Sequence, residues 1–272
     1  MEYFITASQL RTASDWNRMI ALKLQESSSR GGGDRTMQVG ICTEVGNVRQ
    51  QNQDSCGYAG GLFVVADGMG GAQAGEIASA IAVQQLMRLA DVSEGYPEAL
   101  SKAIEAANAT VYNMASADEN YRGMGTTIAL IKLINGMVYF AHIGDSRIYL
   151  KRGPQLTALT FDHSVAAELV RNGGITEAEA QHHPQRHFLT RALGTDAVAR
   201  PEIGQIAAQQ GDLFLLCTDG LTGVVGPDAV NHIMEHGSEV QSMAEALVNA
   251  ACEAGGPDNV SVIIVRITEA DL

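Results

Sequence analysis

The sequence contains few cysteines, and none of them has a metal-binding or redox spacing. The four cysteines, Cys42, Cys56, Cys217 and Cys252, include no CxxC pair, and three of them lie in or beside apolar runs. A disulfide framework or a zinc knuckle needs numerous or closely spaced cysteines. The pattern therefore predicts reduced structural thiols in a cytosolic protein.

Long apolar runs and a secretion signal are also missing from the 272 residues. No apolar run approaches a length of about 18 residues, which a membrane span needs. The N-terminus lacks the basic start and the apolar middle of a signal peptide. We therefore expect no membrane insertion and a cytoplasmic location.

Basic residues are scarce relative to acidic ones. There are 18 Lys and Arg against 31 Asp and Glu, which gives a net charge of −13 and a pI near 4.9. Nucleic acids and anionic membranes bind to basic surfaces, so neither is expected as a partner. Bound cations would offset part of the negative charge.

The length of the chain predicts one catalytic domain preceded by a short extension. A chain of 272 residues, 46% of them hydrophobic, can bury one sizeable core. Residues 6–25 have a helical pattern, and the Ser- and Gly-rich segment 27–34 has the composition of a linker. We therefore expect an N-terminal extension at 1–36 and a catalytic domain at 37–272.

Four apolar runs that are typical of buried strands each have an aspartate at one tip. Asp67, Asp145 and Asp219 come at the ends of such runs, and Asp258 stands just before another. Each aspartate alone is ordinary turn chemistry. If the four tips converge, however, the carboxylates repel one another and their burial is costly. Mg²⁺ or Mn²⁺ would relieve this repulsion, which leads to the hypothesis of a multi-metal hydrolytic centre.

The hydrophobic periodicity and the turn signals predict two packed sheets with helices outside, an α+β fold. Asn135-Gly136 is a strong hairpin signal between two of the strands. The His-rich segment 161–193 is expected to form a short helix and a flap over the site. Helices are predicted at 75–90, 96–116, 227–235 and 240–254, and strands at 37–42, 62–66, 126–133, 137–143, 147–151, 212–217 and 260–267.

Eight short motifs spread between Met37 and Ile267 occur together in this chain. In these motifs and their order, the chain resembles the PPM, or type 2C, metal-dependent Ser/Thr protein phosphatases in their short bacterial form. The motifs are Arg49-x-x-Asn52-Gln53-Asp54, Val65-Ala66-Asp67-Gly68-Met69-Gly70-Gly71, Gly125-Thr126-Thr127, Gly144-Asp145-Ser146-Arg147, Asp162-His163-Ser164, Leu189-Thr190-Arg191-Ala192-Leu193-Gly194, Thr218-Asp219-Gly220-Leu221 and Gly256-Pro257-Asp258-Asn259.

The resemblance implies a four-layer α/β/β/α sandwich with two Mn²⁺ or Mg²⁺ ions in a cleft between two mainly antiparallel sheets. By this resemblance Asp67 would bridge the first two metals, and the carbonyl of Gly68 would join the second. Asp219 and Asp258 would hold the first metal.

The resemblance also assigns roles to three further residues. Asp54 would act through metal-bound water, and Asp145 together with Asp219 would form a third, weaker metal site. Arg49 would hold the substrate phosphate with its planar, permanently charged guanidinium. A metal-bridging hydroxide would then attack phosphorus in line, and the Ser or Thr alkoxide would leave.

The implied function is that of a protein serine/threonine phosphatase. Its partners would be phosphorylated proteins, namely a bacterial Ser/Thr kinase and the substrates of that kinase. We expect a monomer.

Two positions depart from patterns that are common in the family. Gln53 stands where many members have Glu, which removes one negative charge near the metals. Met69 stands where eukaryotic members have a His that is proposed to protonate the leaving group. His163 and His187 are candidates for that role, although a His in a polar loop is more often simply solvated.

Other interpretations of single residues are structural. Thr126 and Thr127 are expected to pack or hydrogen-bond near the sheet, and His142 to be a core or interface histidine. Arg191 is expected to pair with an acidic neighbour and to hold the base of the flap. Ser146-Arg147 could serve only a turn and an outward strand face.

Two other function classes compete with the phosphatase. The Gly-rich turn after Asp67 could bind a nucleotide, but its spacing misses GxGxxG, and no GxxxxGK[ST] occurs in the sequence. A phosphatase-like fold could instead be a catalytically weak binding or regulatory module. The presence of all the metal carboxylates argues against that alternative, because an idle cluster of like charges costs stability.

Overall fold

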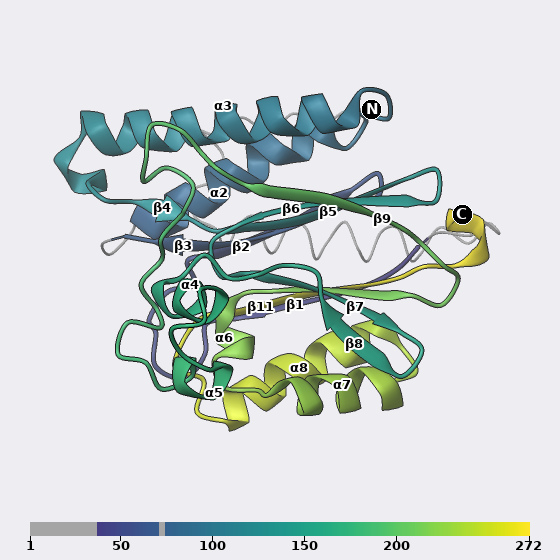
Figure 1. Cartoon of the computed structure of the whole chain (residues 1–272). Helices are drawn as coiled ribbons and strands as arrows, with labels where there is room; N and C mark the ends of the chain where they lie inside the picture. The colour runs from purple at the N-terminus through teal and green to yellow at the C-terminus, as the bar shows by residue number, and fades with distance from the viewer. Residues whose placement is uncertain (1–36, 71–73) are drawn as a thin grey trace.

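Two antiparallel sheets face each other across the centre of the molecule, and a pair of helices covers the outer face of each (Figure 1). The structure, a computed structural model, describes residues 37–70 and 74–272. The predicted N-terminal extension at 1–36 lies outside the described residues. The α+β sandwich predicted from the sequence is confirmed.

One sheet contains the central strand that ends in Asp67. Its strand order is β2-β3-β5-β6-β9, with β4 paired to β3, and all of these pairings are antiparallel. The strands are β2 (Asp54–Ala59), β3 (Leu62–Met69), β4 (Gly125–Thr126), β5 (Ile128–Ile134), β6 (Met137–Ile143) and β9 (Glu202–Ala207).

The other sheet contains the strands that lead to the remaining aspartates. Its order is β1-β11-β10-β7-β8, again antiparallel throughout. The strands are β1 (Gln38–Glu44), β7 (Arg147–Arg152), β8 (Gln155–Ala158), β10 (Leu213–Cys217) and β11 (Val260–Arg266).

Helices α2 and α3 cover the first sheet, and α7 and α8 cover the second (Figure 1). The bounds of the α-helices are α2 (Ala74–Leu86), α3 (Tyr96–Ala117), α4 (Val165–Arg171), α5 (Glu177–Ala180), α6 (Asp219–Thr222), α7 (Pro227–His236) and α8 (Val240–Glu253). Short 3₁₀ turns lie at Met87–Leu89, Glu119–Tyr121 and Glu269–Asp271. No helix in the described part of the chain is both long and apolar enough to cross a bilayer.

Three apolar layers hold the four structural layers together. One layer packs α2 and α3 onto the first sheet, and a second packs α7 and α8 onto the other sheet. The third lies between the sheets, where Phe63 and Val65 of β3 pack with Phe214 and Leu216 of β10. Alternate residues of β3 and β10 therefore serve opposite faces, as the period of a strand requires.

Most predicted elements are present, and the missed ones are short or polar. The Asn135-Gly136 turn joins β5 and β6, and both of its residues have positive φ, at 49° and 72°. Strands β2, β8 and β9 were not predicted. Strand β9 has exposed residues at alternate positions, and β8 has only four residues, so neither produces a strong apolar run. The segment 161–193 contains α4 and α5, a second short helix beyond the one expected.

The strand register brings the acidic tips to one end of the sandwich. Cys217 of β10 pairs with both Arg147 of β7 and Val262 of β11. Asp145, Asp219 and Asp258 therefore leave their strands at the same end of the sheet. In the facing sheet, β2 begins at Asp54, which pairs with Asp67 of β3.

Candidate metal centre

Asp54 and Asp67 are held at the tip of the first sheet by hydrogen bonds to their backbone. The amide of Asp54 donates to Asn52 Oδ1 at 3.1 Å, and the amide of Asp67 donates to Thr127 Oγ1 at 2.9 Å. The hydroxyl of Thr126 donates to the carbonyl of Asp67 at 2.8 Å. The structural roles expected for the two threonines are thus confirmed, and both threonines position Asp67.

The two sheets are connected at this end through Thr218. Its hydroxyl donates to Asp54 Oδ2 at 2.9 Å and accepts from the amide of Ser261 at 3.0 Å. Thr218 is fully buried and directly precedes Asp219, the first residue of α6. The same side chain therefore fixes Asp54 of one sheet beside Asp219 and β11 of the other.

Asn259 connects the remaining loops to Asp258. The Asn259 Oδ1 atom accepts from the amide of Gln53 at 2.9 Å, while its Nδ2 donates to the carbonyls of Val45 and Gln51. The Asp258 Oδ1 atom accepts from the amide of Asn259 at 2.8 Å. Asn259 and Thr218 belong to two of the sequence motifs, but sequence reasoning assigned neither of them a role. Their only signal was membership of a motif that contains an aspartate.

Gly68, which follows Asp67, has no room for a side chain. A Cβ atom at this position would collide with the carbonyl of Gly75 and would come within 2.6 Å of the carbonyl of Gln53. The amide of Gly68 also donates to the carbonyl of Gln53 at 3.2 Å. Glycine at position 68 therefore allows β3, the start of α2 and the Gln53 backbone to approach one another.

Burial and mutual repulsion raise the pKa values of the clustered carboxyl groups. Burial raises the pKa of Asp54 to about 7. Hydrogen bonds from Ser261 and Thr218 oppose this rise, and the charges of Asp219 and Asp258 add to it. The pKa of Asp67 is raised well above its ordinary value, by burial and then by four aspartates, Asp54, Asp219, Asp145 and Asp258.

Asp145 and Asp219 behave in the same way. Burial, followed by the charge of Asp219, raises the pKa of Asp145. Burial, followed by the charge of Asp258, raises the pKa of Asp219, although a hydrogen bond with Asp67 opposes the shift. Burial and neighbouring carboxylates thus hinder the ionisation of four aspartates, Asp54, Asp67, Asp145 and Asp219.

Two buried carboxylate oxygens in the cluster lack a hydrogen-bond partner among the described residues, as expected for the ligands of a cation. Asp54 Oδ1 and Asp219 Oδ1 are buried and have no hydrogen-bond partner among the described residues. An ionised oxygen without a partner is costly to bury. Oxygen ligands from several carboxylates suit Mg²⁺ or Mn²⁺, and such ions would satisfy both atoms.

Arg49 lies at the rim of the cluster. Its Nη2 atom is 2.7 Å from Asp258 Oδ2, and its side chain is 53% exposed. The hydrogen bond to Asp258 raises the pKa of Arg49. Desolvation opposes this rise, and the charges of Asp258, Asp67 and Asp219 support it. The guanidinium of Arg49 therefore lies beside one carboxylate of the cluster and is open to solvent.

The two histidines considered as acids lie in different places. His187 Nδ1 is 3.9 Å from Asp219 Oδ2, and its side chain is 60% exposed. His163 is buried, and its ring contacts the amide of Gly144 and the carboxylate of Glu202. Only His187 of this pair contacts a carboxylate of the cluster.

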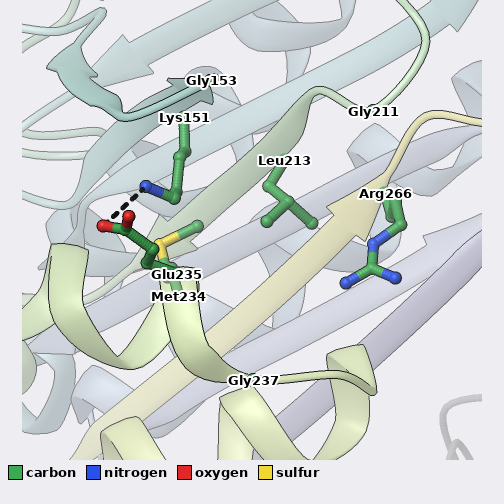
Figure 2. A pocket seen from close by; sticks show the side chains of 8 residues that line it. All are labelled: Lys151, Gly153, Gly211, Leu213, Met234, Glu235, Gly237 and Arg266. Carbon is green, nitrogen blue, oxygen red and sulfur yellow. Dashed lines mark ion pairs between the residues drawn. The ribbon is translucent and has the colours of Figure 1, made fainter.

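A pocket at the far end of the second sheet is separate from the cluster. It has a volume of about 400 Å³. Its wall includes Lys151 of β7, Leu213 of β10 and Arg266 of β11 (Figure 2). Leu213 pairs with the other two residues in the sheet, at the end of these strands that is opposite the aspartates. Lys151 Nζ is 3.8 Å from Glu235 Oε2 across this pocket. None of the predicted site residues lines it.

A model of the family described as protein phosphatase 2C matches residues 46–254, more than half of the chain. The chain belongs to the protein phosphatase 2C family. It is 37% identical over 246 residues to the protein phosphatase PhpP of Streptococcus pneumoniae, and the alignment covers 86% of this chain and 99% of PhpP.

Solved structures of this family have the same fold. The serine/threonine phosphatase PstP/Ppp of Mycobacterium tuberculosis has a TM-score of 0.82 and 35% identity, over 86% of this chain and 99% of the other. The PstP catalytic domain in complex with two manganese ions has a TM-score of 0.79 and 34% identity, with the same coverage. The predictions of the family, the fold, a metal-dependent Ser/Thr phosphatase activity and Mn²⁺ or Mg²⁺ as cofactor are confirmed.

Proposed function

We propose that this member of the protein phosphatase 2C family hydrolyses phosphoserine and phosphothreonine in proteins at the five-aspartate cluster. The observation that supports this proposal most strongly is the pair of buried, unpartnered oxygens, Asp54 Oδ1 and Asp219 Oδ1, among carboxylates that raise one another's pKa. Such a cluster would be unfavourable unless cations occupied it.

The metal ligands proposed are those that the sequence predicted. Asp67 is central in this set, because its carboxyl group interacts with all four of the other aspartates. Asp67 would bridge two ions with the Gly68 carbonyl on the second, and Asp219 and Asp258 would hold the first. Asp54 would reach an ion through water.

Asp145 together with Asp219 would form a third, weaker site. Their placement supports this, because the charge of Asp219 is the largest contribution, after burial, to the raised pKa of Asp145.

The substrate phosphate is proposed to bind to Arg49. A phosphate would compete with Asp258 for this guanidinium, which holds Asp258 through a single short contact of 2.7 Å in the structure. Two parallel N–H donors suit two phosphate oxygens. Mn²⁺ or Mg²⁺, when bound, supplies the Lewis acidity that makes water nucleophilic near neutral pH and that offsets the phosphate charge.

The side chains near the cluster indicate which group would donate a proton to the leaving alkoxide. Met69 cannot supply one, and His163 faces Gly144 and Glu202 instead of the cluster. His187 is the histidine next to Asp219, but it is largely exposed. We infer that water supplies most of this proton transfer and that His187 contributes little.

The finer predictions about partners and organisation remain part of the proposal. They are a Ser/Thr kinase and its substrates as phosphoprotein partners, a monomeric state, and a catalytic domain at 37–272 with a flap at 161–193. A cytoplasmic location is supported by the free thiols of all four cysteines.

Hydrolysis of p-nitrophenyl phosphate with Mn²⁺, measured for the wild type and for Asp67→Asn, tests the proposal. We expect the variant to lose about a thousandfold in turnover, since several kcal/mol of charge stabilisation depend on the ions. Asp228→Asn, an exposed aspartate in the first turn of α7, is the matched control and should keep wild-type turnover. Wild-type protein that binds Mn²⁺ without turnover would support the binding module instead.

A further inference from the structure

A second group of charged and titratable side chains surrounds Glu202, at the start of β9. Glu202 Oε1 is 3.3 Å from His163 Nε2, 3.2 Å from Arg171 Nη2 and 3.7 Å from Arg191 Nη1. Glu202 Oε2 is 3.4 Å from His142 Nε2, and Glu202 is the register partner of His142 in the sheet. This group, the Glu202 cluster, joins the segment 161–193 to the first sheet.

The two histidines of the cluster are buried, and burial favours their neutral form. Their rings stack with centroids 4.4 Å apart, and each has only 1% of its surface exposed. Burial, followed by the charge of His163, lowers the pKa of His142 to about 4. Burial, followed by the charge of Arg191, lowers the pKa of His163 as well. A neutral imidazole has one ring nitrogen that donates and one that accepts.

The hydrogen bonds of His163 determine which of its nitrogens carries the proton. The amide of Gly144 donates to His163 Nδ1 at 3.1 Å, so Nδ1 must be the acceptor. The proton of the neutral ring is then on Nε2, which faces Glu202 Oε1 at 3.3 Å. Arg191 Nη1 is also 3.3 Å from Nε2, but two donors cannot bond, so Arg191 interacts with Glu202. The amide of Gly144 thus sets the tautomer of His163, and Glu202, which faces the protonated Nε2, stabilises it.

This tautomer disfavours a metal ion in the Glu202 cluster. The ligand atoms of His142, His163 and Glu202 lie within 4.8 Å of one another, a spacing that could suit Zn²⁺. An ion on His163 Nε2 would need the lone pair there, and His163 would then lose its bond from Gly144. Arg171 and Arg191 already neutralise Glu202. The contacts therefore favour a positioning role.

His163 holds Gly144 by two hydrogen bonds. Besides the bond to its ring, the amide of His163 donates to the carbonyl of Gly144 at 2.9 Å. Gly144 has a φ of 104°, and a Cβ there would come within 2.6 Å of Thr127 Cγ2. On the other side of Asp145, Ser146 Oγ is 2.6 Å from Thr127 Oγ1. Asp145 is thus fixed between two anchored neighbours.

We propose that His163, in the tautomer that Gly144 sets and Glu202 stabilises, is a positioning residue for Asp145 and so for the weaker third metal site. The inference rests on the proposed function, because Asp145 is a ligand only if the aspartate cluster binds metal. It also connects the segment 161–193 to metal occupancy, since His163, Arg171 and Arg191 all belong to that segment.

Two isosteric replacements of His163 separate positioning from simple loss of packing. The Oδ1 of Asn in His163→Asn can take the place of Nδ1 and accept from Gly144. The carbonyl of Gln in His163→Gln can reach only the Nε2 side. Mn²⁺ binding is measured by calorimetry without substrate. We expect His163→Gln to weaken the weaker class of sites by about 10- to 100-fold, and His163→Asn to stay within about threefold of wild type.

Glu202 supplies an independent pair of variants in case His163→Gln fails to fold. Glu202→Gln keeps an acceptor for Nε2–H and should retain the tautomer, whereas Glu202→Ala should not. The ¹⁵N chemical shifts of the His163 ring report the tautomer directly. We expect an unprotonated Nδ1 in the wild type and Glu202→Gln, and a protonated Nδ1 fraction in Glu202→Ala together with weaker Mn²⁺ binding.

The outcomes distinguish this inference from the proposed function. Equal Mn²⁺ affinities in wild type and His163→Gln, or a wild type with no weaker site, would overturn the inference but leave the phosphatase intact. A wild type that binds no Mn²⁺ would remove both. Zn²⁺ binding that His142→Ala abolishes would replace positioning with a metal site in the Glu202 cluster.

Discussion

Asp54 and Asp212 are both buried, with 0% and 1% of their surface exposed, but their surroundings are opposite. Asp212 receives both nitrogens of the Arg152 fork, at 2.9 Å and 2.7 Å. Asp54 receives a hydroxyl from Thr218 on one oxygen, while its other oxygen has no partner among the described residues. A buried carboxylate with a guanidinium is structurally complete. A buried carboxylate among other carboxylates needs a cation from solution.

Glu202 belongs with Asp212 in this comparison. Burial opposes its ionisation, but hydrogen bonds to His163 and Arg171 outweigh burial and lower its pKa. Asp162 is likewise held by Arg147, with two contacts of 2.7 Å. A two-pronged arginine contact therefore marks Asp212 and Asp162 as structural acids, whereas at the metal centre Asp258 has only a single contact from Arg49.

Removing a carboxylate from the metal centre should produce the largest effect. Asp219→Asn should reduce Mn²⁺-dependent turnover by about a thousandfold, because the ions lose a shared ligand. The metal-free variant should nevertheless unfold at a temperature equal to or above that of the wild type, because one of the repelling charges is gone. Steady-state kinetics and thermal unfolding in chelator measure the two effects. A metal-free variant that unfolds at a much lower temperature would contradict the comparison.

The matched change at a structural acid should have the reverse pattern. Asp212→Asn should lower the free energy of unfolding by about 2 kcal/mol, because Arg152 loses its charged hydrogen-bond partner. Arg152 is 36% exposed, so water replaces part of that interaction. Turnover should stay near the wild-type value, because Asp212 directly precedes β10 and Asp219 follows the other end of that strand. Urea unfolding with a turnover assay checks both, and a large loss of turnover without destabilisation would count against the assignment.

The stability of the metal-free protein should fall as the pH rises. The pKa of Asp54 is raised from its ordinary 3.8 to about 7, so the folded state binds its proton more tightly than the unfolded state does. The stabilisation is complete below about pH 4 and is lost as the pH rises through 7. Thermal unfolding from pH 5 to pH 8 should show this decline in chelator, and Mn²⁺ should reverse it. A metal-free protein that becomes more stable over this range would contradict the raised pKa values.

His187 should produce the smallest effect. Because its side chain is 60% exposed and 3.9 Å from Asp219, we expect His187→Ala to lower turnover by less than about tenfold. Comparing a phosphothreonine peptide with p-nitrophenyl phosphate checks this, since a true general acid matters more for the poorer leaving group. A loss above a hundredfold on the peptide alone would identify His187 as the acid.

Four of the five aspartates were recognisable in the sequence because each stands at one tip of an apolar run, whereas Asp54 was named only through the family resemblance. A strand pattern shows which face is buried and where the chain leaves the core, so Asp67 and Asp219 were recognisable as tip residues. Their convergence depends on strand order, which periodicity alone does not determine. The order β11-β10-β7 comes from the structure.

The residues missed by sequence reasoning act through contacts between distant segments. Thr218 and Asn259 have no periodic or compositional signal, and their roles arise because β10, β11 and the Gln53 segment meet in space. His163 was considered as an acid because Met69 leaves that role open, and its place in a polar loop suggested instead that it is solvated. Its burial against Gly144 and Glu202 depends on β9, a strand whose weak apolar pattern concealed it.

X-ray diffraction from crystals grown with Mn²⁺, measured at the manganese absorption edge, tests the central claim most directly. We predict two strong anomalous peaks beside Asp67, with Asp219 and Asp258 among the residues around them, and their loss in Asp67→Asn crystals. The absence of any peak among these three aspartates, or peaks confined to other surfaces, would contradict the assignment of the aspartate cluster as the metal centre.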